Sequence, residues 1–295
     1  MNSSVSVIIP AYNAEKYLEE AVASVLRQSV PPVEILIVDD GSTDRTLAIA
    51  QGLAAQHAQI TVLTRPNGGS GPARNTGIAQ ASGEYLLFLD ADDRLHENAI
   101  RDHLRAFADR PEAVMVFGAN DVIDAQGVLI NPNPTPVEDV TLEDLAMRVT
   151  PCPSQCLYRR AAVLKINGYN EAFQFSQDVD LNLRIIRIGG VFSHGIKVMD
   201  YRRHPTQSTS KGARISRGHI AVLESNFDQS APFPDPGLLQ RSKAMLYSRY
   251  GLGQFRAALG LLRRGRFSDA GQSARLALLR LKARFQGQVW PPKRS

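Results

Sequence analysis

The chain has 295 residues, of which 43% are hydrophobic and 21% charged, so it can form one large globular domain or a main domain with an appendage. Its net charge of +5 is concentrated between residues 256 and 284, where Asp269 is the only acid, and we therefore expect no dedicated nucleic-acid binding. No apolar run reaches the roughly 20 residues of a membrane-spanning helix, and we expect no secretory signal in residues 1–4.

The first hundred residues alternate between strand and helix patterns. Runs of β-branched and apolar residues predict four strands, at residues 5–9, 34–38, 60–63 and 85–89. Apolar residues at helical spacing predict three helices between them, at residues 14–28, 44–55 and 73–81. Asn13 is the expected cap of the first helix, and Ser42 or Thr43 that of the second. Repeated units of this length predict a parallel sheet whose ligand site lies at the carboxyl ends of the strands.

The middle of the chain is less regular, and its end is helical. We predict, in order, a helix at residues 97–108, a strand at 114–117, a hairpin at 122–130 and a proline-rich loop at 131–136. Beyond residue 214 helical patterns dominate. Two helices, at 242–262 and 268–285, are expected to form a hairpin.

Polar and acidic clusters follow the predicted strands. Three of them are at residues 39–42, 67–75 and 90–93, and a fourth is at 177–180. Because the carboxyl ends of parallel strands meet at one edge of a sheet, we expect the first three clusters to converge there. Asp90, Asp92 and Asp93 are close enough to repel one another unless a cation lies among them. Hard divalent cations take oxygen ligands, so this third cluster is a candidate metal site.

In order and spacing, these segments resemble the inverting GT-A glycosyltransferases of family 2. The resemblance covers residues 6–210, and its segments read VIIPAYN at 7–13, IVDDGSTD at 37–44, ARNTG at 73–77, FLDADD at 88–93, QD at 177–178 and YRRH at 201–204. It implies an α/β fold, GT-A-like (Rossmann-like), with a mostly parallel central sheet flanked by helices and a C-terminal helical extension. The implied domains are a glycosyltransferase domain at 1–214, with a nucleotide-sugar-binding half at 1–93 and an acceptor half at 94–214, and a helical region at 215–295.

The resemblance also implies a reaction. A metal-dependent enzyme would move a sugar from a nucleotide-sugar donor, which we interpret as a UDP-sugar, to a hydroxyl of a glycan or lipid-linked glycan acceptor. Such an enzyme would serve cell-surface polysaccharide or glycoconjugate synthesis. A nucleotide-sugar-binding module without turnover is the alternative. We disfavour a nucleotidyltransferase, because that class normally has a glycine-rich, basic phosphate loop directly after its first strand. Residues 10–13, which follow the first predicted strand, are neither glycine-rich nor basic.

Matched residue by residue, the resemblance implies binding roles. The nucleotide-sugar-binding residues are Pro10, Ala11, Tyr12, Asn13, Asp40, Gly68, Arg74, Asp90 and Ala91. Asp40 would hydrogen-bond the nucleobase, and Arg74 would face the ribose or diphosphate, where a guanidinium offers paired donors. Mg²⁺ or Mn²⁺ would be bound by Asp92, with Asp90 as a second ligand or a ribose contact and His204 at the metal or the diphosphate.

Asp178 matches the catalytic base of the family. It would deprotonate the acceptor hydroxyl as this attacks the anomeric carbon from the opposite face. The family usually has Glu-Asp where this chain has Gln177-Asp178, so a neighbouring charge is lost. Asp180 is a second carboxylate two residues on; we favour Asp178 and leave Asp180 open. Asp93 is interpreted as the cap of the following helix rather than as a ligand.

The basic C-terminal helices lie outside the resemblance. We favour packing of their apolar stripe on the catalytic domain, and the other hypothesis is peripheral attachment to an anionic membrane surface, where a lipid-linked acceptor would lie. The two cysteines, Cys152 and Cys156, are too few for a disulfide framework and lack the further ligands of a zinc site. We therefore expect reduced thiols and a cytoplasmic protein, with contact at the inner face of the cell membrane as the second hypothesis.

Overall fold

The computed structural model describes residues 4–148, 150–205, 207 and 212–247. These residues fall into two compact units, one that extends to Leu145 and resumes at Thr150–Pro205, and one made of residues 146–148 and the described residues from 207 onward. The second unit contains α8 (Gly212–Phe227) and a helix at residues 236–247. The predicted helix at 268–285, and residues 248–262 of the one before it, lie outside the described residues. Among the helices that are described, none combines the length and apolarity needed to cross a bilayer.

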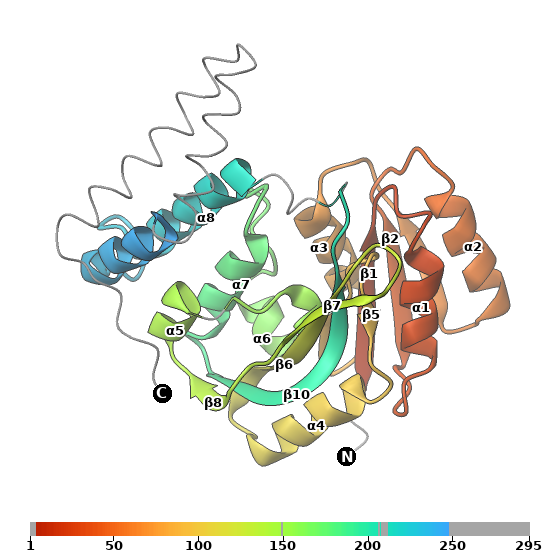
Figure 1. Ribbon diagram of the computed structural model, residues 1–295, viewed down its shortest axis with the longest axis horizontal. Helices are drawn as coiled ribbons and strands as arrows, with labels where there is room; N and C mark the ends of the chain where they lie inside the picture. Colours follow the sequence, from red (N-terminus) through yellow and green to blue (C-terminus); the bar gives the residue numbers. More distant parts are fainter. Residues whose placement is uncertain (1–3, 149, 206, 208–211, 248–295) are drawn as a thin grey trace, which may run out of the picture. The chain divides into compact units, whose positions relative to one another are not determined.

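The first unit alternates strands and helices (Figure 1). Its strands are β1 (Val5–Ala11), β2 (Glu34–Asp39), β3 (Ile60–Thr64), β4 (Tyr85–Phe88), β5 (Arg94–Leu95), β6 (Ala113–Ile123), β7 (Leu129–Asn133), β8 (Val137–Val140), β9 (Cys156–Arg159) and β10 (Gly190–Arg202). Its helices are α1 (Leu18–Leu26), α2 (Thr46–Gln56), α3 (Ser70–Gln80), α4 (Ala99–Asp109), α6 (Arg160–Lys165) and α7 (Gln177–Ile185), with a 3-10 turn at Pro153–Gln155. Helix α5 (Leu142–Met147) lies at the boundary between the units.

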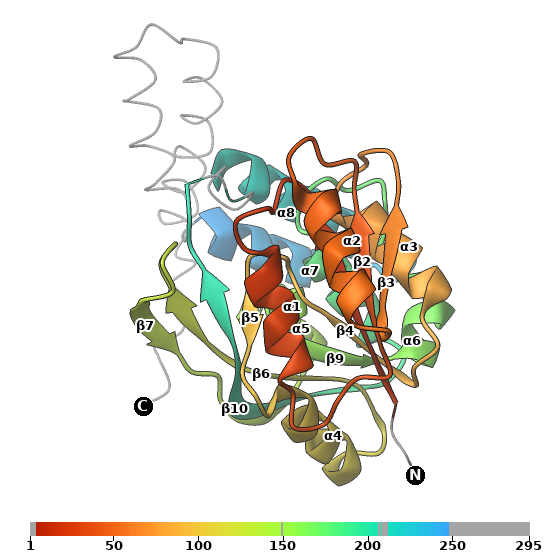
Figure 2. The ribbon, with the colours of Figure 1, turned by 90° about the vertical axis from the view of Figure 1, so that its right-hand side faces the viewer.

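All the strands belong to one sheet in the order β3-β2-β1-β4-β9-β6-β10-β5, with β7 beside β6 and β8 beside β10. Strands β3, β2, β1 and β4 are parallel, as predicted. Strand β9 runs antiparallel between β4 and β6, and the long β10 is parallel to β6 but antiparallel to β5 and β8 (Figure 2). The predicted α/β fold with a helix-flanked sheet is confirmed, and the sheet is mixed beyond β4.

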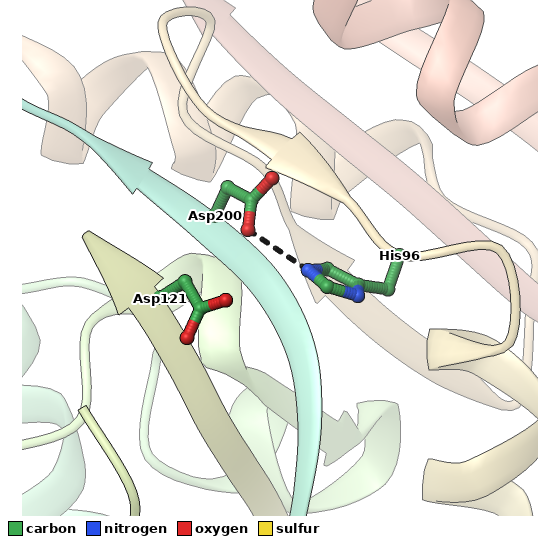
Figure 3. A group of neighbouring side chains, drawn as sticks. All are labelled: His96, Asp121 and Asp200. Atoms are coloured by element: carbon green, nitrogen blue, oxygen red, sulfur yellow. Dashed lines mark hydrogen bonds and ion pairs between the residues drawn. The ribbon is translucent and has the colours of Figure 1, made fainter. Parts of the chain in front are cut away.

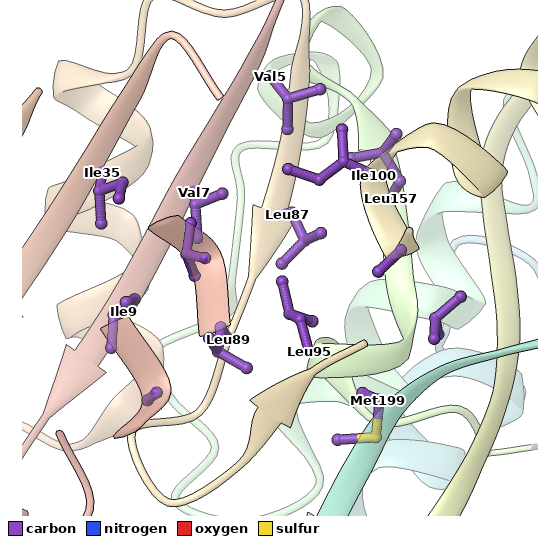
Figure 4. Close-up of a cluster of buried hydrophobic side chains, with 14 of the residues drawn as sticks. Val5, Val7, Ile9, Ile35, Leu87, Leu89, Leu95, Ile100, Leu157 and Met199 are labelled. Atoms are coloured by element: carbon purple, nitrogen blue, oxygen red, sulfur yellow. The ribbon is translucent and has the colours of Figure 1, made fainter. Parts of the chain in front are cut away.

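Helices cover both faces of the parallel strands. On one face Val7, Ile9 and Leu87 pack in a core that also contains residues of α1 and α4 (Figure 4). On the other face Ile8 lies against α3, where a Cβ at Gly77 would overlap its side chain. Burial on both faces explains why these strands read as continuous apolar runs. Each buried aliphatic side chain contributes roughly 1.5–3 kcal/mol, so the core holds the strand ends, and the loops after them, in place.

The predicted helix caps are wrong. Helix α1 begins at Leu18, and Asn13 has a φ of 49°. Its Oδ1 accepts the N–H of Thr43 at 2.8 Å, so its side chain joins the loops after β1 and β2 instead of capping α1. Helix α2 begins at Thr46 without a side-chain cap from Ser42 or Thr43.

The predicted strand at 114–117 and hairpin at 122–130 are parts of one longer unit. Strand β6 covers the predicted strand and continues into the first arm of the hairpin, where it ends at Ile123 and pairs antiparallel with β7. The predicted loop at 131–136 is wrong at its start, because β7 continues to Asn133. Pro132 is tolerated there because β7 pairs with β6 alone among the described strands, which leaves its other edge without a ladder that needs the missing N–H.

Candidate functional site

The carboxyl ends of the parallel strands lie at one edge of the sheet. Ala11 pairs with Asp39 in the register of β1 and β2, and Asp39 pairs with Thr64 of β3. The N–H of Asp40 donates to the carbonyl of Ala11 at 2.8 Å, and β4 pairs with β1 on its other side. The loops after these strands therefore meet, which brings the predicted polar clusters together.

Asp40 lies at this edge and holds the glycine-rich loop. Its carboxylate accepts the N–H of Gly69 at 2.7 Å and that of Gly68 at 3.1 Å, and it pairs with Arg65 at 2.7 Å. Gly69 has a φ of 93°, a left-handed conformation that favours glycine, and α3 begins directly after it. The side chain predicted to bind a nucleobase is thus already engaged with the loop.

The residues predicted to line a nucleobase pocket lie at the end of β1, beside the end of β2 and the loop after it. Pro10 and Ala11 end β1, and Tyr12 follows with 52% of its surface exposed. Asn13 bonds across to the loop after β2, as described above. The exposed ring of Tyr12 is therefore available for stacking against a planar ligand.

Arg74 on α3 joins the helix to the acidic cluster after β4. Its guanidinium is buried, pairs with Asp90 and lies 5.1 Å from the ring centre of Tyr169. Burial alone would lower the pKa of Arg74, but the charge of Asp90 raises it above its ordinary value, so Arg74 stays protonated. Its buried Nε has no hydrogen-bond partner among the described residues.

Asp92 is paired with His204. The Nε2 of His204 donates to Oδ2 of Asp92 at 2.9 Å, and the imidazole lies 5.0 Å from the ring of Tyr17. Burial and then the charge of Asp90 raise the pKa of Asp92, and His204 partly offsets them. Negative charge is thus crowded at this point, which is the condition that a divalent cation relieves. The neighbouring Ala91 is buried.

Asp93 is not a helix cap, contrary to the sequence-based interpretation. Helix α4 begins six residues later, at Ala99. The carboxylate of Asp93 is buried, and it accepts the Oγ–H of Ser154 at 2.8 Å and the backbone N–H of Arg202 at 3.0 Å. Burial, followed by the charges of Asp92 and Asp90, raises its pKa well above the ordinary value. Asp93 therefore joins the acidic loop to the 3-10 turn and the end of β10.

Asp178 and Asp180, the two candidates for a base, have different surroundings. Asp178 is partly buried in the first turn of α7; burial raises its pKa, and the charge of Arg74 only partly offsets this. Asp180 is 1% exposed and forms an ion pair with Arg184 at 2.7 Å. The carboxylate near the acidic cluster and Arg74 is that of Asp178.

A second group of ligand-type side chains lies elsewhere on the sheet. His96 follows β5, Asp121 lies on β6 and Asp200 lies on β10 (Figure 3). Each offers one ligand atom, and these atoms lie within 4.8 Å of one another. The distances between these ligand atoms would allow the group to hold a metal ion. Both carboxylates already have cationic partners, however, since Lys197 is 2.5 Å from Asp121 and Arg94 is 2.7 Å from Asp200. We interpret this group as an ion-pair cluster of the sheet.

Two residues of the candidate site were not predicted from the sequence. Arg65 opens the glycine-rich loop and pairs with Asp40, and its position as a lone cation directly before Pro66 was the available signal. Asp39 is 3% exposed, and its Oδ1 has no hydrogen-bond partner among the described residues. Asp39 and Asp40 are adjacent and identical in type, so no sequence pattern shows that an oxygen of Asp39 lacks a partner while both oxygens of Asp40 have one.

Residues 6–166 match the model of the family described as "Glycosyl transferase family 2". The chain is 33% identical to a chondroitin synthase of Escherichia coli over 76% of this chain and 33% of that protein. It is 33% identical to a glycosyltransferase of Bacillus subtilis, EpsJ, over 70% of this chain and 62% of that protein. The chain thus spans less than two thirds of each relative.

Solved structures show the same fold. The structure of Staphylococcus aureus TarS, residues 1–349, in complex with UDP-GlcNAc has a TM-score of 0.65 and 19% identity, and the match covers 98% of this chain and 93% of that one. The structure of GalNAc-T7 with UDP, GalNAc and Mn²⁺ has a TM-score of 0.61 at 15% identity, over 84% of this chain and 50% of that one. The mixed sheet with flanking helices is therefore a GT-A fold.

Proposed function

The chain belongs to glycosyl transferase family 2, and on this basis we propose that it is an inverting glycosyltransferase. It moves a sugar from a nucleotide-sugar donor to a hydroxyl of a glycan or lipid-linked glycan. The observation that carries the proposal is the position of Arg74, which pairs with Asp90 and acts electrostatically on Asp178. One buried cation therefore acts on a carboxylate of the proposed donor site and on the proposed base.

In this proposal the nucleotide lies on the loops after β1, β2 and β3. Tyr12 stacks on the nucleobase, and Pro10, Ala11 and Asn13 complete that pocket. Asp40 accepts a hydrogen bond from the base or, through its bonds to Gly68 and Gly69, keeps the loop in shape for the diphosphate. The N-terminus of α3 supplies N–H donors to phosphate oxygens, and the positive charge of Arg74 favours them. Asp90 and Ala91 border the ribose.

The residues at the acidic loop fit a divalent cation, Mg²⁺ or Mn²⁺. The fit rests on the crowding of Asp90 and Asp92, since burial and then the charge of Asp90 raise the pKa of Asp92. Asp92 is the proposed ligand, with His204 beside it and Asp90 as a second ligand or a ribose contact. A bound cation would neutralise charge on the departing nucleoside diphosphate. The ion pair with Arg74 orients Asp90.

Asp178 is the proposed base. Its raised pKa makes it a stronger proton acceptor than an exposed aspartate, and its charged form remains accessible because Arg74 is near. It would take the proton of the acceptor hydroxyl as the oxygen attacks the anomeric carbon opposite the leaving diphosphate. That direction of attack inverts the anomeric configuration. The ion pair of Asp180 with Arg184 supports Asp178 over Asp180.

The names of similar proteins support the substrate classes. They include chondroitin synthase, hyaluronan synthase and a poly(ribitol-phosphate) beta-N-acetylglucosaminyltransferase. We infer a UDP-sugar donor, as in the TarS complex with UDP-GlcNAc, and an acceptor from cell-surface polysaccharide or glycoconjugate synthesis.

The rest of the organisation is also a proposal. Residues 1–93 would bind the donor, 94–214 would face the acceptor, and 215–295 would form a helical region. Synthesis of this kind from UDP-sugars is consistent with a cytoplasmic protein. We also propose that the basic residues at 256–284 contact anionic lipids at the inner face of the cell membrane.

A thermal-shift panel tests the donor assignment. The chain is heated with UDP-, GDP- and TDP-sugars, each with and without Mn²⁺. We expect the UDP-sugars to raise the melting temperature, and to do so more strongly with Mn²⁺, because a ligand that binds the folded state stabilises it. Indifference to every nucleotide-sugar would contradict the proposal. A nucleotide-sugar-binding module would show the same stabilisation but no transfer or hydrolysis, so a turnover assay on the same samples separates the two functions.

A further inference from the structure

Gln177 lies where the helix of the proposed base meets the helix of the glycine-rich loop. Its side chain is 6% exposed, so it is buried at the start of α7, next to Asp178. Its Oε1 accepts the Oγ–H of Ser70, the first residue of α3, at 3.2 Å. Residues 107 positions apart in the chain are thus joined directly at the proposed site.

Gly71 provides the space for this contact. A Cβ at residue 71 would lie 2.7 Å from Cδ and 2.8 Å from Oε1 of Gln177. Atoms cannot approach this closely without a shift, so any larger residue at 71 would displace the amide. The small size of Gly71 therefore leaves the amide of Gln177 in place, and a side chain at residue 71 would require that amide to move.

The other end of the amide explains why the residue is glutamine. Its Nε2 donates to the backbone carbonyl of Phe173, one turn earlier in the chain. This bond fixes the orientation of the amide, because the opposite one would place two acceptor oxygens against each other. A carboxylate has no donor for the Phe173 carbonyl when ionised, so glutamate in the same place would be repelled. The glutamine that departs from the Glu-Asp pair of the sequence resemblance is thus matched to its neighbours.

The loop before α7 is held on α3 at a second point as well. Asn75 accepts the N–H of Tyr169 at 2.8 Å and donates to the carbonyl of the same residue at 2.9 Å. Ser176, directly before α7, has a left-handed conformation with a φ of 59°. The segment between Tyr169 and Ser176 is thus held at both ends, by Asn75 at its start and by Gln177 at its end.

We propose that Gln177 is a positioning residue that places the base Asp178 relative to the donor site, through its contacts with Ser70, Gly71 and Phe173. The inference rests on the proposed function. Helix α3 carries Arg74 one turn after Gly71, and Arg74 pairs with Asp90 of the donor site. The contact of Gln177 with α3 therefore sets the place of Asp178 with respect to Arg74 and, through Arg74, to the donor. Gln177 itself touches no reacting atom.

The test compares two variants of Gln177 with a matched control. Gln177→Glu keeps the shape and removes the donor, and Gln177→Met keeps the approximate volume and removes both hydrogen bonds. Gln51→Glu makes the same charge change at an exposed position of α2. For each protein, kcat and the acceptor KM are measured by sugar transfer, and the Kd of UDP with Mn²⁺ by calorimetry.

We expect Gln177→Glu to lower kcat by about tenfold to a hundredfold, the effect of a base displaced by a fraction of an ångström to an ångström. The Kd of UDP should stay within about twofold of wild type, because Gln177 is not a proposed contact of UDP and a lost contact would weaken binding by more than this. Gln177→Met should lower kcat less, and it serves in place of the first variant if that one does not fold. Gln51→Glu should match wild type.

A double variant gives a second readout. Gly71→Ala should lower kcat because the added methyl displaces Gln177, and in a Gln177→Ala background the same change should lower kcat no further, because the side chain that it displaces is absent. Wild-type kcat in both Gln177→Glu and Gln177→Met overturns the inference and leaves the proposed function standing. So does a loss of kcat that is matched by an equal weakening of UDP binding. Absence of transfer by the wild-type chain overturns both.

Discussion

The guanidinium of Arg74 and the carboxylate of Asp90 form an ion pair between α3 and the end of β4. The pair lies at the carboxyl edge of the sheet, and Arg74 also acts on Asp178 at the start of α7. Three segments that are far apart in the chain thus meet around one buried cation.

Replacement of the proposed base should abolish transfer and leave donor binding intact. Asp178→Asn keeps the shape of the side chain but cannot accept the acceptor's proton, so kcat should fall by about 10² to 10⁴. The Kd of UDP should change little. Because burial raises the pKa of Asp178, wild-type kcat/KM should begin to fall, as the pH is lowered, at a higher pH than an exposed aspartate would give. Transfer that persists in Asp178→Asn would refute the assignment.

Replacement of Asp180 should affect stability instead of chemistry. Asp180→Asn leaves the charge of Arg184 without its buried partner. Removal of one member of a buried pair costs about 3–5 kcal/mol, less where water reaches the remaining group. Urea unfolding should show a reduced free energy of unfolding, with kcat per folded molecule close to wild type. A loss of kcat in the fully folded variant would instead make Asp180 the base.

Arg74→Lys should weaken binding of the nucleoside diphosphate. Lysine keeps the charge but lacks the planar guanidinium, so it cannot pair with Asp90 and face the diphosphate in the same geometry. We expect the Kd of UDP with Mn²⁺ to rise by about tenfold, which is 1.4 kcal/mol. Arg45→Lys is the control, because the side chain of Arg45 is 81% exposed. Equal affinities of both variants and the wild type would remove Arg74 from the binding site.

Metal dependence should follow Asp92 and not the cluster of His96, Asp121 and Asp200. Asp92→Asn should abolish the strengthening of UDP binding by Mn²⁺, because the proposed ligand is lost. Asp121→Asn should leave that strengthening intact, since its carboxylate pairs with Lys197. Calorimetric titration of UDP with Mn²⁺ or with EDTA measures both. The reverse result would assign the metal to the cluster on β6 and β10.

A buried pair of histidines should make the fold sensitive to acid. His194 accepts the N–H of Ile196 at its Nδ1, so its Nε2–H donates to Nδ1 of His103 at 3.0 Å. Burial lowers the pKa of His103 well below its ordinary value and that of His194 to about 4. Both are therefore neutral in the folded protein at neutral pH.

The unfolded chain takes up these protons more readily than the folded one, near pH 6.5, so stability from this pair is complete above that pH and is lost as the pH falls toward 4. The shift of His194 alone corresponds to roughly 3 kcal/mol. The free energy of unfolding should therefore decline between pH 6.5 and 4.5, and the decline should be smaller in His103→Phe. An equal decline in that variant would show that other groups cause it.

Much of the parallel part of the fold was predictable because its signals are local. A strand buried on both faces needs an unbroken apolar run, and β1, β2 and β4 have such runs. The ends of these strands could be predicted from the ends of the apolar runs. The convergence of the clusters after β2, β3 and β4 could then be predicted from the strand ends. Helix caps were less predictable. Asn13 accepts a hydrogen bond from Thr43 in another loop, and no local pattern indicates a partner thirty residues away.

The sequence by itself determined the order of strands and helices, the family and the group of residues that gather at the edge of the sheet, because apolar period and motif spacing are properties of the chain. Only the tertiary structure decided how those residues divide their partners. Asp93 joins β10 and the 3-10 turn instead of capping a helix, and Asp180 pairs with Arg184 while Asp178 lies near Arg74. Hydrogen bonds and charge pairs are made between segments that the sequence separates, so they are settled by packing and not by local pattern.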